Sequence, residues 1–425
     1  MACHFRYTPE RLDIIHTIAK KNIDISMLRK LQTSLATFIQ SFLPVLRPES
    51  QLLATQKWAL GLLNLSMVIV FWVGSSFLVN DLFESNVYRK PFFITWINTS
   101  CFVFYLIPYL KHHNYSVAQF LDAVQQDYRK MRQRGLKDAE APAEPLAEYG
   151  SRDTSESDLN LAKLPDDEVG ICETLLLSLQ FIVLWFSANL VTNASLSYTL
   201  VASQTILSST LSFFTLIFGY LYRIEKINRN KILGIVLSFS GVLIVTKIDS
   251  TSAADVPEGS TPLIALWGNV LALAGALIYG IYTILLKHKI TRPDTAQERT
   301  LNTHLFFGFV GLYCLVLLWP VLIALHFLGV EHFQLPKGAH VIKLLCINAF
   351  ITFISDFCWC KAVLLTSPLT VTVGLSLTIP LAMVGDWVFK GFHVNFWYLF
   401  GAVIVTLGFL VINKDEQDDF TGEAE

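Results

Sequence analysis

The chain has 425 residues, of which 53% are hydrophobic and 16% are charged, and its formal net charge is −2. Soluble proteins typically carry roughly 25% charged residues, so this composition excludes an ordinary soluble enzyme. The near-neutral net charge gives no reason to expect a nucleic-acid partner. Seven cysteines are scattered without a CxxC pair, so neither a disulfide framework nor a metal site is expected.

Residues 1–57 precede the first apolar run and are predicted to form a cytosolic N-terminal segment. Apolar side chains recur there at steps of three and four residues, namely Leu28, Leu31, Leu35, Phe38, Ile39 and Phe42. This spacing is typical of an amphipathic helix. Such a helix would either lie on the membrane surface or pack on the cytosolic face of the protein itself.

Ten apolar runs follow and are predicted to be transmembrane helices. A hydrocarbon core about 30 Å thick is crossed by roughly 20 helical residues, and its backbone polar groups must hydrogen-bond within their own segment. The runs cover residues 58–79, 92–110, 171–190, 198–222, 232–245, 263–286, 305–329, 341–365, 369–389 and 394–412. The hydroxyl-rich residues 191–197 are predicted to form a tight reversal between the third and fourth helices.

The distribution of Lys and Arg predicts the orientation of the chain. When the loops are assigned alternately to the two sides, 26 of the 32 basic residues fall on the side of the N-terminus and 6 on the other. Since basic loops stay in the cytosol, both termini are predicted to be cytosolic. The loop at 111–170 becomes acidic and proline-rich, so most of it is expected to be disordered, and residues 414–425 are expected to be an acidic, solvated tail.

The sequence contains a weak internal repeat. A shift of 167 residues aligns the third, fourth and fifth runs with the eighth, ninth and tenth. Two pairs of glycines then coincide, Gly234 with Gly401 and Gly241 with Gly408. Helices five positions apart cross the membrane in opposite directions, because five is odd. The sequence therefore predicts an all-α membrane fold of two inverted five-helix repeats, 58–248 and 249–413, with the substrate between them.

Asp356 is the sharpest candidate for a functional residue. An ionisable group within a span costs a few kcal/mol on insertion scales and usually has a function. It lies about 5 Å from the centre of its run, with Asn348 and Thr352 on the same helical face. Asp356 either binds the substrate or a proton, or it makes a structural hydrogen bond.

Other candidates lie in other runs. Two polar residues would contact either the solute or a neighbouring helix, namely Asn189 and Gln204. Aromatic and hydroxyl residues would either line a cavity, where rings suit a flat solute, or pack in the core, namely Trp72, Ser75, Ser76, Tyr279 and Tyr282. Asp386 lies late in the ninth run, where it would reach the membrane interface and either have a function there or form a terminal ion pair with Lys390 one turn on.

Three strings carry a resemblance to a known family: Lys90-Pro91-Phe92-Phe93, Trp185-Phe186-Ser187-Ala188-Asn189-Leu190 and Leu375-Ser376-Leu377-Thr378-Ile379-Pro380-Leu381. They are similar to strings of the drug/metabolite transporter superfamily, and more closely of the F subfamily of solute carrier family 35. The similarity covers about residues 58–412. It implies a fold of ten helices in five-plus-five inverted repeats with cytosolic termini.

These patterns favour a secondary transporter that moves a small polar metabolite by alternating access, with proton coupling as one option. Nucleotide sugars are carried in the wider family, but a diphosphate favours buried Arg or Lys, whereas the deepest charge is the acidic Asp356. A transport-inactive receptor or scaffold docking through loop 111–170 is the alternative. An integral membrane enzyme is least favoured because no P-loop, HExxH or Ser/His/Asp cluster occurs, and no cofactor is expected. The partners are an unidentified small solute and the lipid bilayer, in an endomembrane such as the vacuole, lysosome or Golgi rather than the plasma membrane.

Overall fold

The structure is a computed structural model whose two compact units are Met1–Lys57 and Trp58–Glu425. It describes residues 53–84, 90–140, 168–195, 201–252, 262–291, 298–329, 331–336, 338–390 and 396–422. The predicted amphipathic helix of the N-terminal segment lies outside the described residues.

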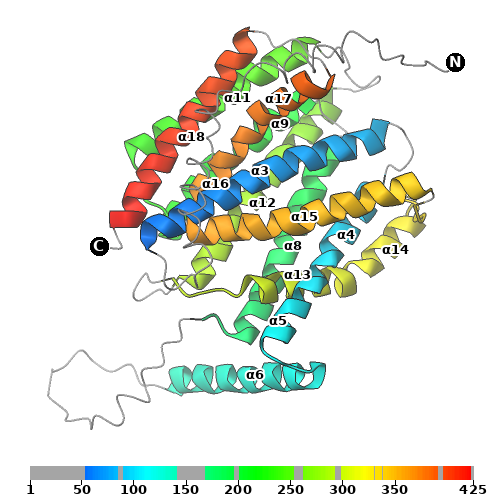
Figure 1. Cartoon of the computed structure of the whole chain (residues 1–425), viewed down its shortest axis with the longest axis vertical. Helices are drawn as coiled ribbons and strands as arrows, with labels where there is room; N and C mark the ends of the chain where they lie inside the picture. Colours follow the sequence, from blue (N-terminus) through cyan, green and yellow to red (C-terminus); the bar gives the residue numbers. More distant parts are fainter. Residues whose placement is uncertain are drawn as a thin grey trace, which may run out of the picture. The chain divides into compact units, whose positions relative to one another are not determined.

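The secondary structure of the described residues is helical, with two isolated β-bridges and no β-strand among these residues (Figure 1). In chain order the helices are α3 (Ala54–Glu84), α4 (Pro91–Ser100), η3 (Cys101–Tyr105), α5 (Leu106–His112), α6 (Val117–Glu140), α8 (Ile171–Ser195), α9 (Val201–Ser209), α10 (Leu211–Leu221), α11 (Arg229–Ser252), α12 (Pro262–Ile290), α13 (Thr303–Leu317), α14 (Trp319–Phe327), α15 (Ala339–Leu365), α16 (Pro368–Gly374), η4 (Leu375–Leu377), α17 (Thr378–Lys390) and α18 (Phe396–Gly422).

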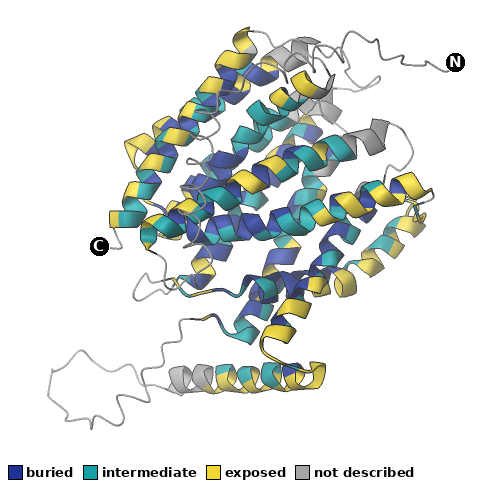
Figure 2. Cartoon of the chain, viewed as in Figure 1, coloured by how far each residue is buried: buried dark blue, intermediate teal, exposed yellow. Residues whose placement is uncertain are grey.

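Eight helical segments of the described chain are long and apolar enough to cross a membrane. A further segment, Thr205–Leu221, is apolar but shorter. Outward-facing side chains such as Val70, Val183 and Phe350 are apolar and exposed, as expected for residues that face lipid (Figure 2). The prediction of an all-helical polytopic membrane protein is confirmed, and the count of ten spans stays a prediction.

Helices α11 and α18 pack antiparallel along their lengths at a backbone-to-backbone distance that only glycine permits (Figure 1). A Cβ atom added at Gly241 would stand 2.7 Å from the carbonyl oxygen of Gly401. One added at Gly408 would stand 2.6 Å from the carbonyl oxygen of Gly234. Since lipid gives no hydrophobic drive for helices to associate, such close packing is a main source of their attraction.

The first prediction concerns this close approach. The substitution Gly408→Val should destabilise the protein by roughly 1–3 kcal/mol or more, because the added carbons collide with the backbone of α11. Thermal unfolding in detergent measures the loss. Gly74→Val is the matched control, since a Cβ at Gly74 meets nothing within 4 Å. Equal melting temperatures for the two variants would contradict the packing.

Four of the predicted spans are interrupted helices. The second consists of α4, η3 and α5, and the seventh consists of α13 and α14, which meet at Leu318. The fourth consists of α9 and α10, which meet at Thr210, and the ninth consists of α16, η4 and α17. Hydroxyl groups occupy the breaks of the fourth and ninth spans: Thr210 Oγ1 donates to the Leu207 carbonyl, and Thr378 Oγ1 donates to the Leu375 carbonyl. Carbonyls near a helix break inside a membrane need such donors, so the hydroxyl residues stabilise the breaks.

The structure differs from the sequence prediction in two loops. Helix α8 continues to Ser195, so the reversal expected at 191–197 does not begin at its first residues. The loop at 111–170 contains the 24-residue helix α6, so the expected disorder does not hold there, and residues 141–167 lie outside the described part. Phe120 of α6 packs in one apolar cluster with side chains of α5 and α13. The overall charge of the loop concealed this apolar face.

Candidate functional site

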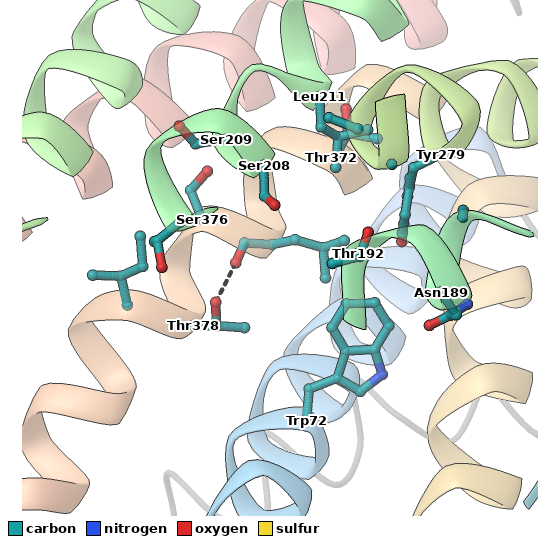
Figure 3. Close-up of a pocket in the computed structure, with 16 residues that line it drawn as sticks. Trp72, Asn189, Thr192, Ser208, Ser209, Leu211, Tyr279, Thr372, Ser376 and Thr378 are labelled. Carbon is teal, nitrogen blue, oxygen red and sulfur yellow. Dashed lines mark hydrogen bonds between the residues drawn. The ribbon is translucent and has the colours of Figure 1, made fainter. Parts of the chain in front are cut away.

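A polar cavity of about 310 Å³ lies where α3, α8, α9, α12 and the broken segment α16–η4–α17 meet (Figure 3). Nine of its lining residues carry a hydroxyl or amide group: Asn189, Thr192, Thr205, Ser208, Ser209, Tyr279, Thr372, Ser376 and Thr378. The apolar part of the wall comes from Trp72, Ala188, Leu211, Gly275, Ala276, Leu375 and Ile379. No charged residue lines the polar cavity within the described chain. Its size is at the lower end of small-molecule pockets.

The helix breaks of the fourth and ninth spans contribute to the wall of the polar cavity. Ser209 ends α9 and Leu211 begins α10, while Leu375 and Ser376 belong to η4 and Thr378 begins α17. Figure 3 shows Ser208, Ser376 and Thr378 on one side of the space, with Trp72, Thr192 and Tyr279 on the other. Interrupted helices expose polar groups that a continuous helix would satisfy internally, which suits recognition of a polar solute.

Three of the predicted candidates line the polar cavity, namely Trp72, Asn189 and Tyr279. Tyr282 is buried behind them, with its ring 4.6 Å from that of Tyr279. It therefore supports the cavity wall and does not form it. The side chain of Gln204 lies outside the described residues, as does that of Asp386.

Asp356 lies behind the wall, outside the set of lining residues, and is 7% exposed. The side chain of Trp72 lies close to its carboxyl group. The Oδ2 oxygen of Asp356 has no hydrogen-bond partner among the described residues. The buried atoms Tyr279 Oη and Trp359 Nε1 also have no hydrogen-bond partner there. None of the ion pairs between described residues includes Asp356. Unmet buried polar atoms are costly, so this corner is suited to bind a proton, a water molecule or a polar group.

The remaining candidates lie on α3 and α15. Asn348 is buried and accepts a hydrogen bond from Ser75 Oγ at 2.6 Å. Ser76 is exposed and donates to the backbone carbonyl of Trp72 within α3. Thr352 is half-buried on α15. The Ser75–Asn348 hydrogen bond thus joins the helix that carries Asp356 to the helix that carries Trp72.

Sequence reasoning missed most of the hydroxyl groups in the wall, although a signal for them existed. Ser209 and Ser376 coincide under the shift of 167 residues, as do Thr205 and Thr372. All four of these hydroxyl residues line the polar cavity. Hydroxyl residues at equivalent positions of two related spans would have indicated a shared polar surface.

A cluster of buried charges, called here the Lys231 cluster, lies at the opposite end of α10 from the polar cavity. Lys231 of α11 is 1% exposed, and its Nζ lies 2.6 Å from Glu416 Oε1 and 3.0 Å from Asp419 Oδ2 of α18. It also lies 3.8 Å from Glu225 Oε2. The other oxygen of Glu225 accepts a hydrogen bond from the backbone N–H of Leu369, in the first turn of α16. The cluster thus joins α11, α16, α18 and the turn between α10 and α11.

Glu225 lies in that turn, outside the membrane-spanning helices. Burial and the neighbouring Glu416 carboxylate raise the pKa of Glu225 well above its ordinary value of 4.5, although Lys231 opposes the shift. The folded state therefore binds this proton more tightly than the unfolded state does. Stability should consequently fall as the pH rises above the ordinary carboxyl range.

Replacing Lys231 by methionine tests the cluster. Lys231→Met should lower stability by roughly 3–5 kcal/mol, because removing one partner leaves buried carboxylates unpaired. The loss should be larger at about pH 8 than at about pH 5, where Glu225 takes up a proton. Thermal unfolding at both pH values measures it, with exposed Lys414→Met on α18 as the control. A loss independent of pH would show that the carboxylates are not the cause.

Comparison with known proteins finds relatives that are named as membrane or transport proteins. No protein-family model matches it. An uncharacterized vacuolar membrane protein of Saccharomyces cerevisiae is 45% identical, over 86% of this chain and 92% of that protein. A thiamine-repressible mitochondrial transport protein of the same yeast is 41% identical, over 83% and 91%. Solute carrier family 35 member F5 of Pongo abelii is 30% identical, over 84% and 77%. A crystal structure of another protein shares the fold at a TM-score of 0.53 and 11% identity, over 85% of this chain and 98% of that one.

Proposed function

Because the chain belongs to solute carrier family 35, we propose that it is a secondary transporter that carries a small polar solute by alternating access. The observation that carries the proposal is the polar cavity, which lies among helices whose outer faces are apolar. A vacuolar membrane protein among its relatives supports a place in an endomembrane such as that of the vacuole.

The proposed architecture consists of two inverted repeats, 58–248 and 249–413. The glycine contacts between α11 and α18 support it: Gly234 meets Gly408, and Gly241 meets Gly401. The residue equivalent to Gly234 is Gly401, and the residue equivalent to Gly408 is Gly241, each 167 positions away. Replacing both residues of the first contact by their equivalents therefore gives the second contact. A pair of contacts that exchange in this way is the pattern expected when a two-fold axis passes between the two helices. The breaks at the polar cavity follow the same offset.

The chemistry of the wall favours a neutral or cationic solute. Hydroxyl and amide groups can donate and accept hydrogen bonds without a charged partner, and Trp72 and Tyr279 offer aromatic faces to a ring. A diphosphate is disfavoured because none of the described lining residues supplies an Arg or Lys. A positive charge on the solute would be attracted by the carboxyl group of Asp356, which lies behind Trp72.

Alternating access requires the polar cavity to be closed at one end at a time. The Lys231 cluster supports closure at the end where α10 packs against α16, because Glu225 holds the N-terminus of α16. Lys and Arg counts predict that this end is cytosolic. We therefore assign the structure to a state closed toward the cytosol, in which opening requires α16 to leave Glu225.

Blocking the polar cavity should abolish transport without unfolding the protein. The solute is first identified by comparing metabolite pools of sealed vacuoles with and without this chain, and its uptake is then measured in proteoliposomes. Ser376→Phe should reduce uptake at least tenfold, since a bulky ring fills the polar cavity. Ser66→Phe, on an exposed part of α3, is the control. Normal uptake by Ser376→Phe would refute the proposed site, and identical pools would refute transport.

Asp356→Asn tests proton coupling. An amide keeps the size of the carboxyl group but cannot exchange a proton, so the dependence of uptake on pH should disappear between about pH 5 and pH 8. Asp418→Asn, at an exposed position of α18, should leave the pH profile unchanged. A retained pH profile in Asp356→Asn would assign Asp356 to solute binding or to structure.

A further inference from the structure

Helix α6 is attached to the ends of two candidate membrane spans. Residues 113–116 alone separate it from the span Phe92–His112. At its middle, Asp127 Oδ2 accepts a hydrogen bond of 2.8 Å from the backbone N–H of Cys172, in the first turn of α8. Because α8 begins the next span there, these two connections hold α6 at the depth where the spanning helices end.

One side of α6 packs on the protein, and the adjacent side is apolar but uncovered. Phe120 is buried and Val124 packs with it in one apolar cluster. Val117, Leu121 and Tyr128 are instead 68%, 61% and 53% exposed. At about 100° per residue these three lie within about 40° of one another, centred about 60° from the side that carries Phe120 and Val124. They form the apolar stripe of α6.

Basic residues border the apolar stripe on its outer side. Arg132 and then Arg129 follow the stripe around the helix, and both are exposed. Asp127 is turned toward α8, and the exposed Asp122 lies beyond Arg129, away from the stripe. An apolar stripe with an arginine edge is typical of helices that lie in the surface of an anionic bilayer.

We propose that α6 is an interfacial helix that binds acidic lipid headgroups of the membrane that the chain itself spans. The apolar stripe enters the level of the upper acyl chains, and Arg129 and Arg132 contact headgroup phosphates or carboxylates. The spans that adjoin α6 on both sides face lipid, since Ile107 of α5 and Leu176 of α8 are exposed apolar residues. A soluble protein would have to displace that lipid in order to cover the stripe.

Hydrogen–deuterium exchange of the full-length protein in nanodiscs tests the proposal. Amides of α6 should exchange at least fivefold more slowly in discs containing phosphatidylserine than in pure phosphatidylcholine, since each basic residue near an anionic surface contributes about a fivefold preference. The double substitution Arg129→Gln/Arg132→Gln should remove this difference. Unchanged exchange in α11 and α18 verifies that the variants are folded.

A matched pair of acidic substitutions tests the apolar stripe. Leu121→Asp should speed exchange of α6 several-fold in the anionic discs, because it places a carboxylate among the acyl chains. Gln126→Asp adds the same charge at an exposed position on the opposite side of the helix and should have no such effect. Equal exchange in both lipids, equal effects of the two substitutions, or protection that appears only as protein concentration rises would overturn the proposal. The last outcome would assign the stripe to contact between copies of the chain.

Discussion

In hydrocarbon, every backbone N–H and C=O must find its partner inside the protein, and this constraint determines where a binding site can form. A continuous helix satisfies its own backbone and leaves little for a solute. In this chain the helix pairs α9–α10 and α16–α17 are interrupted, and hydroxyl groups such as those of Thr210 and Thr378 donate to nearby carbonyls. Residues of the same interruptions form the polar cavity, so the requirement for backbone satisfaction and the polarity of the site have a common origin.

Two kinds of contact, close glycine packing and buried ion pairs, hold the helices around that cavity. Between α11 and α18, glycine brings backbone against backbone, so this pair is suited to act as a fixed support. The Lys231 cluster holds α16 through a single carboxylate hydrogen bond at its first turn. The glycine contacts extend along the whole of α11 and α18. The hydrogen bond between Glu225 and α16 is local, so it can break without separating α11 from α18. This difference fits the proposal that opening requires α16 to leave Glu225, and it lets the α11–α18 contact persist.

The sequence predicts the spans well because a long apolar run in lipid has one low-energy solution, the helix. It also singled out Asp356 and Asn189, since carboxyl and amide groups are uncommon in such runs, and Trp72 and Tyr279, whose rings carry a polar group. It could not separate Tyr279 from Tyr282, because that depends on how α12 is rotated against its neighbours. Helix α6 was missed for another reason: the charge of its loop outweighed its few apolar residues, although at helical spacing Val117, Phe120, Leu121, Val124 and Tyr128 share one face.

The position of Asp356 limits how its charge can influence transport. Trp72 and Tyr279 line the polar cavity, and both lie near the carboxyl group of Asp356, which is buried behind them. A change of charge on Asp356 therefore acts first on the positions of these two rings, while the Ser75–Asn348 hydrogen bond keeps α3 and α15 in register. In the proposed transporter, a proton and a solute need not compete for the same atoms. They would be coupled through the aromatic rings that separate the buried carboxyl group from the polar cavity. Such coupling requires these rings to contact the solute differently in the two charge states of Asp356.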